Sequence, residues 1–235
     1  MKMNSAIVLF SGGIDSTTAL YWAKREFSKI LALTFLYGQK HSIEVEMAKI
    51  ITEKEGIEQR IINVDLSQIG GSSLTDRGIE IEDIKLEELG ERIPSTYVPF
   101  RNGIFLSLAT ALAEVVDSDS IVTGFHSLDS PNYPDTSREF VDSMERAINS
   151  GTRAGRLGRK ISILSPLIGM KKEEIIRFGL ELGADYSYSI SCYRGEEVPC
   201  MRCPACRIRD SAWKSLGIED HLIKRLKKEG KWHGF

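Results

Sequence analysis

Neither sign of charge is in excess in this chain, and histidine is scarce. Its 235 residues contain 31 Lys and Arg against 33 Asp and Glu, which leaves a formal net charge of −2. Dedicated nucleic-acid and membrane-surface binders depend on clustered positive charge, so the composition argues against both classes. The four histidines are too scattered along the chain to predict a histidine metal site; they are His41, His126, His221 and His233.

Long hydrophobic runs are also missing. The longest stretches without charge, such as Gly103–Ala113, are too short to span a bilayer. The N-terminal residues Met1 to Ser5 lead into five apolar residues, fewer than a secretory signal peptide needs. We therefore expect a cytoplasmic protein with no membrane contact and no stable nucleic-acid partner.

Short apolar segments alternate with segments of helical spacing along most of the chain. Strands are predicted at 6–10, 30–36, 60–66, 120–124 and 161–164, and helices at 15–27, 42–54, 102–116, 137–148 and 172–182. Such alternation indicates right-handed crossover units and a parallel sheet with helices on both faces. We predict a doubly wound, Rossmann-like α/β fold. We expect residues 1–235 to form a single domain, with a separate cysteine-containing segment at 186–210 and a helical tail at 211–235.

A glycine-rich turn separates the first predicted strand from the first predicted helix. The turn reads Ser11-Gly12-Gly13-Ile14-Asp15-Ser16, and its glycines let backbone N–H groups approach an anion at the helix N-terminus. It lacks the lysine of a Walker A loop and the spacing of a dinucleotide-binding loop. Asp15 beside an anion is explained either as a helix N-cap or as a Mg²⁺ ligand. A plain strand–turn–helix connection is the alternative.

All four cysteines lie within fifteen positions. Cys192, Cys200, Cys203 and Cys206 have the spacing C-x7-C-x2-C-x2-C, which predicts a structural zinc site with four thiolate ligands. An iron–sulfur cluster remains open because C-x2-C-x2-C is also found in ferredoxins. No cysteine is left over for catalysis.

The turn resembles SGGxDS, the pyrophosphate loop of ATP pyrophosphatases, which share the adenine nucleotide alpha hydrolase-like fold. Together with Thr34–His41, Pro94–Leu108, Val122–Phe140, Ser165–Glu174 and the cysteine segment, it resembles the 7-cyano-7-deazaguanine synthase family nearly from end to end. The resemblance implies an ATP-binding segment of Phe10, Ser11, Gly12, Gly13, Ile14, Asp15, Ser16, Thr17, Thr18, Ala19 and Leu20.

The same resemblance implies an ATP-dependent ligase of queuosine and archaeosine precursor biosynthesis. Such an enzyme converts 7-carboxy-7-deazaguanine and ammonia to a nitrile, with Mg²⁺ and ATP as co-substrate and one structural Zn²⁺. Asp15, Arg101 and Lys172 are the candidate catalytic residues, although each of the two cations could also be an ordinary surface charge. The candidate substrate residues are Arg101, Asn102, His126, Asp129, Tyr133 and Asp135. A homodimer and free ammonia as the nitrogen source are also implied.

Two segments depart from the family pattern. Phe100 stands where the family usually has glycine, and His126-Ser127-Leu128-Asp129 stands where it usually has Cys-Glu-Thr-Asp. We expect Phe100 to fill space beside Arg101, and we expect the loop 125–136 to form a wall of the substrate pocket. Three alternatives stay open: a paralogue that activates a related carboxylate for a different amine, a tRNA-thiolating enzyme, and an ATP-binding regulatory module.

Overall fold

The computed structural model describes residues 2–39, 43–76, 78–82, 93–126, 133–232 and 234. Five parallel strands form one sheet in the order β3-β2-β1-β4-β5. Their bounds are β1 Met3–Leu9, β2 Phe27–Leu36, β3 Glu58–Asn63, β4 Ser120–Val122 and β5 Ser162–Leu164. The order reverses direction between β1 and β4, which is the topology of a doubly wound fold. The predicted fold class is confirmed.

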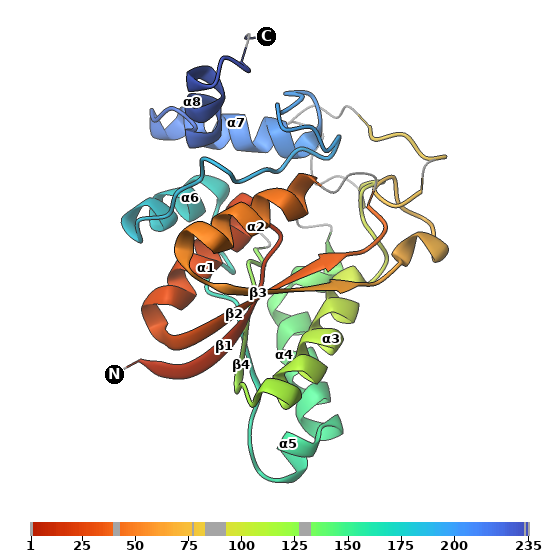
Figure 1. Ribbon diagram of the computed structural model, residues 1–235. Coiled ribbons are helices and arrows are strands. Elements are labelled where there is room, and N and C mark those ends of the chain that lie inside the picture. The colour runs from red at the N-terminus through yellow and green to blue at the C-terminus, as the bar shows by residue number, and fades with distance from the viewer. Residues whose placement is uncertain are drawn as a thin grey trace.

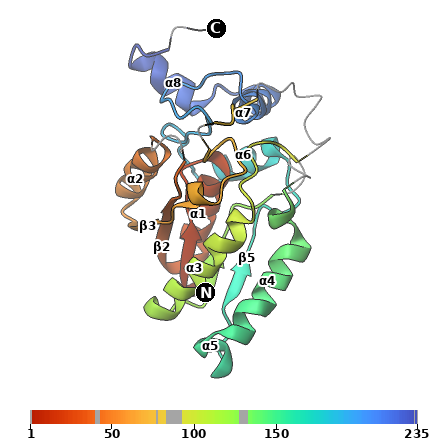
Figure 2. The ribbon, with the colours of Figure 1, turned by 90° about the vertical axis from the view of Figure 1, so that its right-hand side faces the viewer.

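Helices cover both faces of this sheet, as Figure 2 shows. One face carries α1 (Ile14–Glu26), α2 (Ile43–Glu55) and α6 (Lys172–Glu181), and the other carries α3 (Arg101–Val116) and α4 (Arg138–Gly151). A short helix, α5 (Arg153–Arg156), follows α4, and short 3₁₀ turns lie at Leu66–Gln68 and Pro134–Thr136. Successive residues of β1 point to opposite faces, so Ala6 and Val8 pack with α1 while Ile7 packs with α3.

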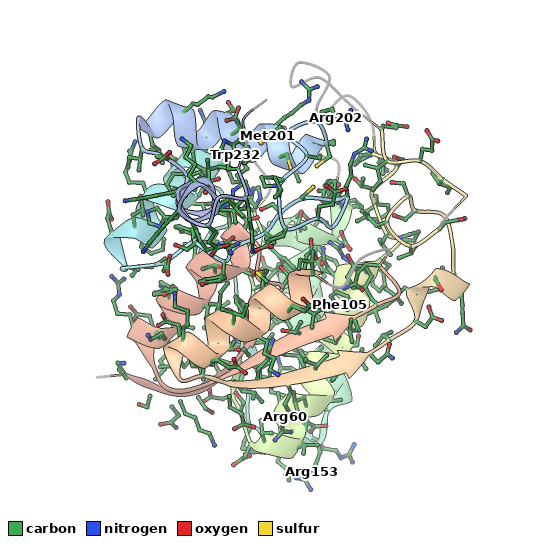
Figure 3. All side chains as sticks on the ribbon, turned by 45° about the horizontal axis from the view of Figure 1, so that its top comes forward. Arg60, Phe105, Arg153, Met201, Arg202 and Trp232 are labelled. Carbon is green, nitrogen blue, oxygen red and sulfur yellow. The ribbon has the colours of Figure 1, made fainter. Side chains whose placement is uncertain are left out.

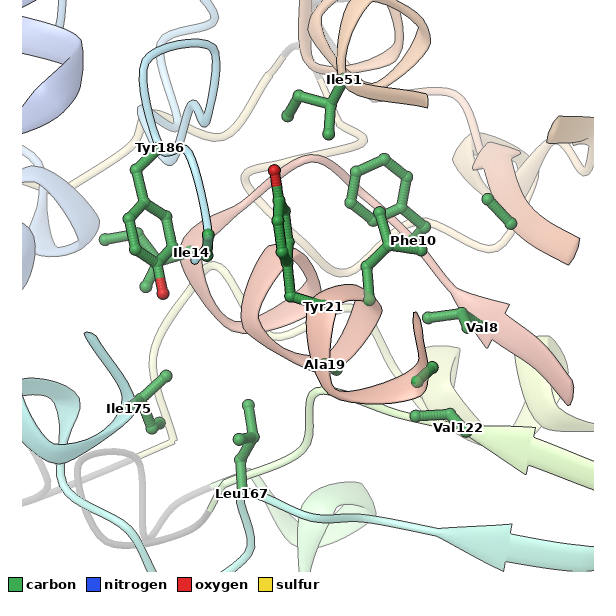
Figure 4. Packing of buried hydrophobic residues seen from close by; sticks show 14 of the residues in the cluster. Val8, Phe10, Ile14, Ala19, Tyr21, Ile51, Val122, Leu167, Ile175 and Tyr186 are labelled. Atoms are coloured by element: carbon green, nitrogen blue, oxygen red, sulfur yellow. The ribbon is translucent and has the colours of Figure 1, made fainter. Parts of the chain in front are cut away.

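The core under α1 is built from segments that are distant in the sequence. Figure 4 shows Val8 and Val122 from the sheet, Ala19 from α1, and Leu167 and Ile175 from the segment around α6. These five side chains are at most 1% exposed. Because α1 is buried this completely, the loop at its N-terminus sits on a rigid support.

The C-terminal part of the chain lies across the carboxyl ends of the strands, at the top of Figure 1. It contains α7 (Pro204–Leu216) and α8 (His221–Lys228). The predicted boundary between a zinc-binding segment and a helical tail, at residue 210, falls inside α7, so the two form one unit. Helix α7 begins inside the cysteine cluster, with Cys203 as its N-cap.

In the described part of the chain, no helix combines the length and apolar character needed to cross a bilayer.

Candidate active site

A cavity of about 340 Å³ lies at the carboxyl edge of the sheet. Its walls include Phe10 after β1, Tyr37 after β2 and His126 after β4. Ligands of open α/β sheets bind at this edge, where the strand order reverses. Phe125, His126, Tyr133 and Thr136 all line the cavity, so both described ends of the loop 125–136 contribute to the pocket wall, as predicted.

The glycine-rich turn forms one end of this cavity. Gly12 has φ +81°, and a Cβ there would lie 3.2 Å from the carbonyl oxygen of Glu44 in α2. The Ser16 hydroxyl lies 3.1 Å from the Ser11 hydroxyl and donates to the Gly13 carbonyl at 3.1 Å. The N–H groups in the first turn of α1 have no acceptor within the helix and carry its positive dipole end. The turn can therefore hold an anionic group such as pyrophosphate.

The next four residues of the predicted ATP segment lie behind this turn. Thr17, Thr18, Ala19 and Leu20 are fully buried and do not line the cavity, whereas Phe10, Ser11, Gly13, Ile14, Asp15 and Ser16 do. The Thr18 hydroxyl shares a 2.6 Å hydrogen bond with the Tyr186 hydroxyl, which holds α1 against the C-terminal part of the chain.

Asp15 does not cap helix α1. The N-cap is Gly13, and Asp15 in the first turn is engaged by two side chains from distant elements. The Nζ of Lys172 donates to its Oδ1 at 2.6 Å, and the Nε2 of His126 lies 3.3 Å from its Oδ2. Lys172 Nζ and His126 Nε2 are 3.0 Å apart, so the three groups form a closed triangle. The N-cap interpretation is wrong, and the Mg²⁺-ligand interpretation remains a prediction.

This triangle holds a stable negative charge beside the anion-binding turn. Burial raises the pKa of Asp15, but the nearby charges of Lys172 and His126, with their hydrogen bonds, outweigh burial and bring the pKa well below its ordinary value. The side chains of Lys172 and His126 are only 12% and 10% exposed. Lys172 is therefore a fixed positive charge of the site and not an ordinary surface cation.

Arg101 lines another part of the same cavity. Its guanidinium lies over the ring of Tyr37, 5.5 Å from the centroid, and 6.0 Å from that of Phe105. It also lies 3.4 Å from the Tyr37 hydroxyl. Burial would lower the pKa of Arg101, but the facing Tyr37, Tyr193 and Asp135 raise it above its ordinary value. The cation is thus held rigidly on aromatic rings, and among the described residues most of its N–H donors remain available to an anion.

Three other predicted substrate residues lie around Arg101. Asn102 lines the cavity, and its backbone N–H donates to Asp135 Oδ2 at 3.0 Å. Asp135 is only 3% exposed and is not among the described wall residues, so it holds the start of α3 in place. Tyr133 lines the cavity with its hydroxyl 2.9 Å from that of Thr96. Asp129 lies outside the described residues.

Phe100 does not fill the pocket, contrary to expectation. Its side chain is 53% exposed, and its ring lies 5.9 Å from that of Phe140 on α4. It also packs on Gly103, where a Cβ would lie 2.4 Å from the ring. Phe100 has φ +53°, a left-handed conformation that glycine adopts without strain. The departure from the family pattern therefore affects the backbone and outer surface, not the cavity.

The four cysteines meet at one point. All four are buried, and their sulfur atoms lie within 4.8 Å of one another. Four ligands at the Zn–S distance of about 2.3 Å are about 3.8 Å apart, and Cys200 and Cys206 are separated by 3.9 Å. The cluster thus fits one tetrahedral ion. The cysteines of an iron–sulfur cluster bind different metal atoms, so this close spacing favours a single ion.

The negative charge of four thiolate groups also requires a bound cation. Hydrogen bonds from Cys203 and Cys206 lower the pKa of Cys192, and hydrogen bonds with Cys192 and Cys203 raise the pKa of Cys206. Four thiolates at this spacing are stable only around a positive ion. The donors fit Zn²⁺ in a structural role.

The cysteine segment is itself a wall of the cavity. Ser191, Cys192, Tyr193 and Gly195 line it, together with Ala205 and Ile208 from α7. Figure 3 shows Phe105 near the centre of the molecule, and Met201 and Arg202, which lie between Cys200 and Cys203, near the top of the view. A metal at the cysteines therefore supports the pocket as well as the fold.

Sequence reasoning missed Tyr37, Glu44, Phe105 and Tyr193 as cavity residues. Glu44 alone carried a usable signal. It is a charged residue in register with the buried positions Ala48 and Ile51 of α2, one and two turns along the same face. The aromatic residues gave none, because aromatics at such spacing are also typical of a core.

The chain is similar to several known proteins over nearly its whole length. It is 44% identical to the 7-cyano-7-deazaguanine synthase of Persephonella marina, over 96% of this chain and 99% of that one. It is 42% identical to that of Psychrobacter cryohalolentis, over 93% and 89%. Among solved structures, a 4-thiouridine synthetase in complex with RNA and ATP has a TM-score of 0.50 at 23% identity. That match covers 91% of this chain and half of the other, and it supports the fold alone.

Residues 5–217 match the family described as queuosine biosynthesis protein QueC. That range includes the pyrophosphate loop, Arg101, Lys172 and all four cysteines. The chain belongs to the QueC family.

Proposed function

We propose that this protein is a 7-cyano-7-deazaguanine synthase that uses ATP to convert the carboxylate of 7-carboxy-7-deazaguanine into a nitrile, with ammonia as the nitrogen source. One observation carries the proposal beyond the family match. The anion-binding turn, the Asp15–Lys172–His126 triangle and the stacked Arg101 share one cavity at the carboxyl edge of the sheet. That cavity offers places for both a polyphosphate and a planar acid.

The first half of the reaction makes an amide. A carboxylate oxygen attacks the α-phosphorus of ATP, and pyrophosphate leaves into the turn formed by Ser11–Ser16. Ammonia then attacks the activated carbonyl carbon, loses a proton, and displaces AMP together with that oxygen.

The second half repeats the activation on the amide. The amide oxygen attacks the α-phosphorus of a second ATP, and pyrophosphate leaves again. The nitrogen then gives up its two remaining protons as the C–O bond breaks, which leaves a nitrile and a second AMP. Both carboxylate oxygens thus end on AMP, one on each molecule.

The side chains act mainly by positioning and by compensating charge. Lys172 and the first-turn N–H groups of α1 stabilise the negative charge on the phosphates. Asp15, ionised at neutral pH, is suited to hold the Mg²⁺ that accompanies ATP. Arg101 is suited to bind the acid, because its donors face the cavity. His126 holds Asp15 and Lys172 in their relative positions.

The cysteine segment supports this assignment in a second way. All four cysteines of the chain belong to the metal cluster, so no thiol remains for hydrolysing glutamine or for carrying sulfur. We propose free ammonia as the nitrogen donor on this ground, and Zn²⁺ as a structural ion. A cytoplasmic homodimer, as the family resemblance implies, is also proposed, and light scattering on the purified protein tests the dimer.

Isotope labelling tests the reaction directly. The purified zinc protein is incubated with ATP, Mg²⁺, ammonium and 7-carboxy-7-deazaguanine labelled with ¹⁸O in the carboxylate, and the products are analysed by mass spectrometry. We expect the nitrile and two AMP per turnover, each AMP with one labelled oxygen. AMP and pyrophosphate without any product from this acid would contradict the proposed substrate. An amide to a different amine would favour the paralogue, which the His126 departure motivates.

A further inference from the structure

Glu44 is a carboxylate of the cavity wall that the reaction described above does not use. It lies in the first turn of α2 and lines the cavity. Within the described residues its carboxylate makes no hydrogen bond and no ion pair, although the side chain is partly buried. The described wall contains one other carboxylate, Asp15, which Lys172 and His126 already engage.

An isolated carboxylate in such a place is costly for the free enzyme. Burial, opposed by Arg101 and reinforced by the charge of Cys192, raises the pKa of Glu44 to about 7. A carboxyl group in a cavity wall whose pKa is raised in this way is typical of a ligand-binding site. Glu44 therefore points to a ligand that brings hydrogen-bond donors.

The surroundings of Glu44 indicate the shape of that ligand. The rings of Tyr37 and Phe105, 5.6 Å apart, line the cavity beside Arg101. Aromatic walls suit a flat ring. The cation of Arg101 and the anion of Glu44 attract each other across the cavity, but no direct ion pair joins them in the described part of the chain. The pair matches a planar ligand with an anionic group and a separate edge of N–H donors.

We propose that Glu44 is a specificity-determining residue that accepts hydrogen bonds from the amidine-like edge of the substrate, namely its ring N–H and the adjacent exocyclic amino group. A carboxylate with two free oxygens accepts this pair of parallel donors, as it does from arginine. The inference rests on the proposed function for the identity of the acid. Its consequence is rejection of purine-like acids that lack the 2-amino group.

Two variants in the same helical turn test the proposal. Glu44→Gln keeps the size of the side chain but presents an amide donor to the substrate's donors. Glu46→Gln removes an exposed charge two residues further along α2 and serves as the matched control. Each is assayed with 7-carboxy-7-deazaguanine and with the analogue that lacks the 2-amino group, at saturating ATP and ammonium.

We expect Glu44→Gln to lower kcat/KM for the 2-amino acid by about 10- to 100-fold, mostly through KM, because a hydrogen bond to a charged group is lost. Activity on the analogue should fall distinctly less, because the analogue keeps the ring N–H but has no 2-amino donor to lose. Glu46→Gln should leave both unchanged. Equal losses on the two acids, no loss on either, or a raised requirement for Mg²⁺ or ammonium would each overturn the proposal.

A binding experiment separates this inference from the proposed function. Calorimetry compares 7-deazaguanine with 7-deazahypoxanthine on the wild type and on Glu44→Gln, and it needs no turnover. We expect the wild type to prefer 7-deazaguanine by about tenfold or more, and the variant to lose the preference. If the wild type is inactive on the acid but keeps this preference, the proposed function fails and the role of Glu44 stands. Absence of the preference in the wild type refutes the role of Glu44.

Discussion

Replacing Glu44 by glutamine should make the ligand-free protein more stable, and the gain should depend on pH. In the folded protein the pKa of Glu44 is raised from 4.5 to about 7 by burial. The folded state therefore binds more protons than the unfolded state between these values. The contribution of Glu44 to stability is full below pH 4.5 and is lost as pH rises through 7.

The magnitude follows from the same shift. The rise in pKa from 4.5 to about 7, at 1.36 kcal/mol per pKa unit, gives an upper limit of about 3 kcal/mol at pH 8, and partial exposure of the side chain reduces this to about 2 kcal/mol. Glutamine does not titrate, so the variant avoids this cost. For a chain of 235 residues the expected rise in Tm is about 4 to 8 °C at pH 8.

Thermal unfolding of the zinc-loaded wild type, Glu44→Gln and Glu46→Gln at pH 5 and pH 8 measures the effect. Comparing variants at one pH cancels the contribution of the zinc site, which all three share. We expect the Tm of Glu44→Gln to exceed that of the wild type at pH 8 and to differ little from it at pH 5. The Tm of Glu46→Gln should equal that of the wild type at both pH values. Equal Tm values for wild type and Glu44→Gln at pH 8 would refute the reasoning, because they would mean that the carboxylate is not desolvated.

Three further substitutions test other parts of the site. Gly124→Ala places a Cβ 2.8 Å from the backbone of Asp15, so the turn must shift. We expect the variant to lose about 1 to 3 kcal/mol of stability and to bind ATP more weakly in calorimetry. Unchanged ATP affinity would contradict this. Cys203→Ser should lose zinc and lower Tm, and also raise KM because the segment is a cavity wall; a variant with full zinc and the wild-type Tm would refute the assignment. Phe100→Gly relieves the left-handed strain at about 1 kcal/mol but loses the contact with Phe140, so Tm should change by only a few degrees and kcat/KM should stay within about tenfold. A larger loss of kcat/KM would mean that Phe100 reaches the substrate.

The elements of the fold were predictable because their signals are local. Continuous apolar runs predicted all five strands, and the strand before the glycine-rich turn located the anion site. The bounds differ by up to three residues; for example, β2 begins at Phe27 directly after α1, where the apolar pattern had suggested residue 30. The cysteine cluster was equally readable, since three of its ligands lie within seven residues and share one turn region.

The sequence by itself determined the parallel sheet, the pyrophosphate loop and the metal ligands, because periodicity, glycine and cysteine spacing act over a few residues. Only the tertiary structure brought Lys172 onto Asp15, 157 residues away, and turned the metal segment into a wall of the cavity. It also directed Phe100 outward and, among the residues that the structure describes, left the Glu44 carboxylate without a direct ion pair beside Arg101. The physical reason is that a charged or aromatic side chain has the same local pattern whether it faces water, core or cavity. Its surroundings, and with them its pKa and its partners, are set by the packing of helices from distant parts of the chain against the sheet.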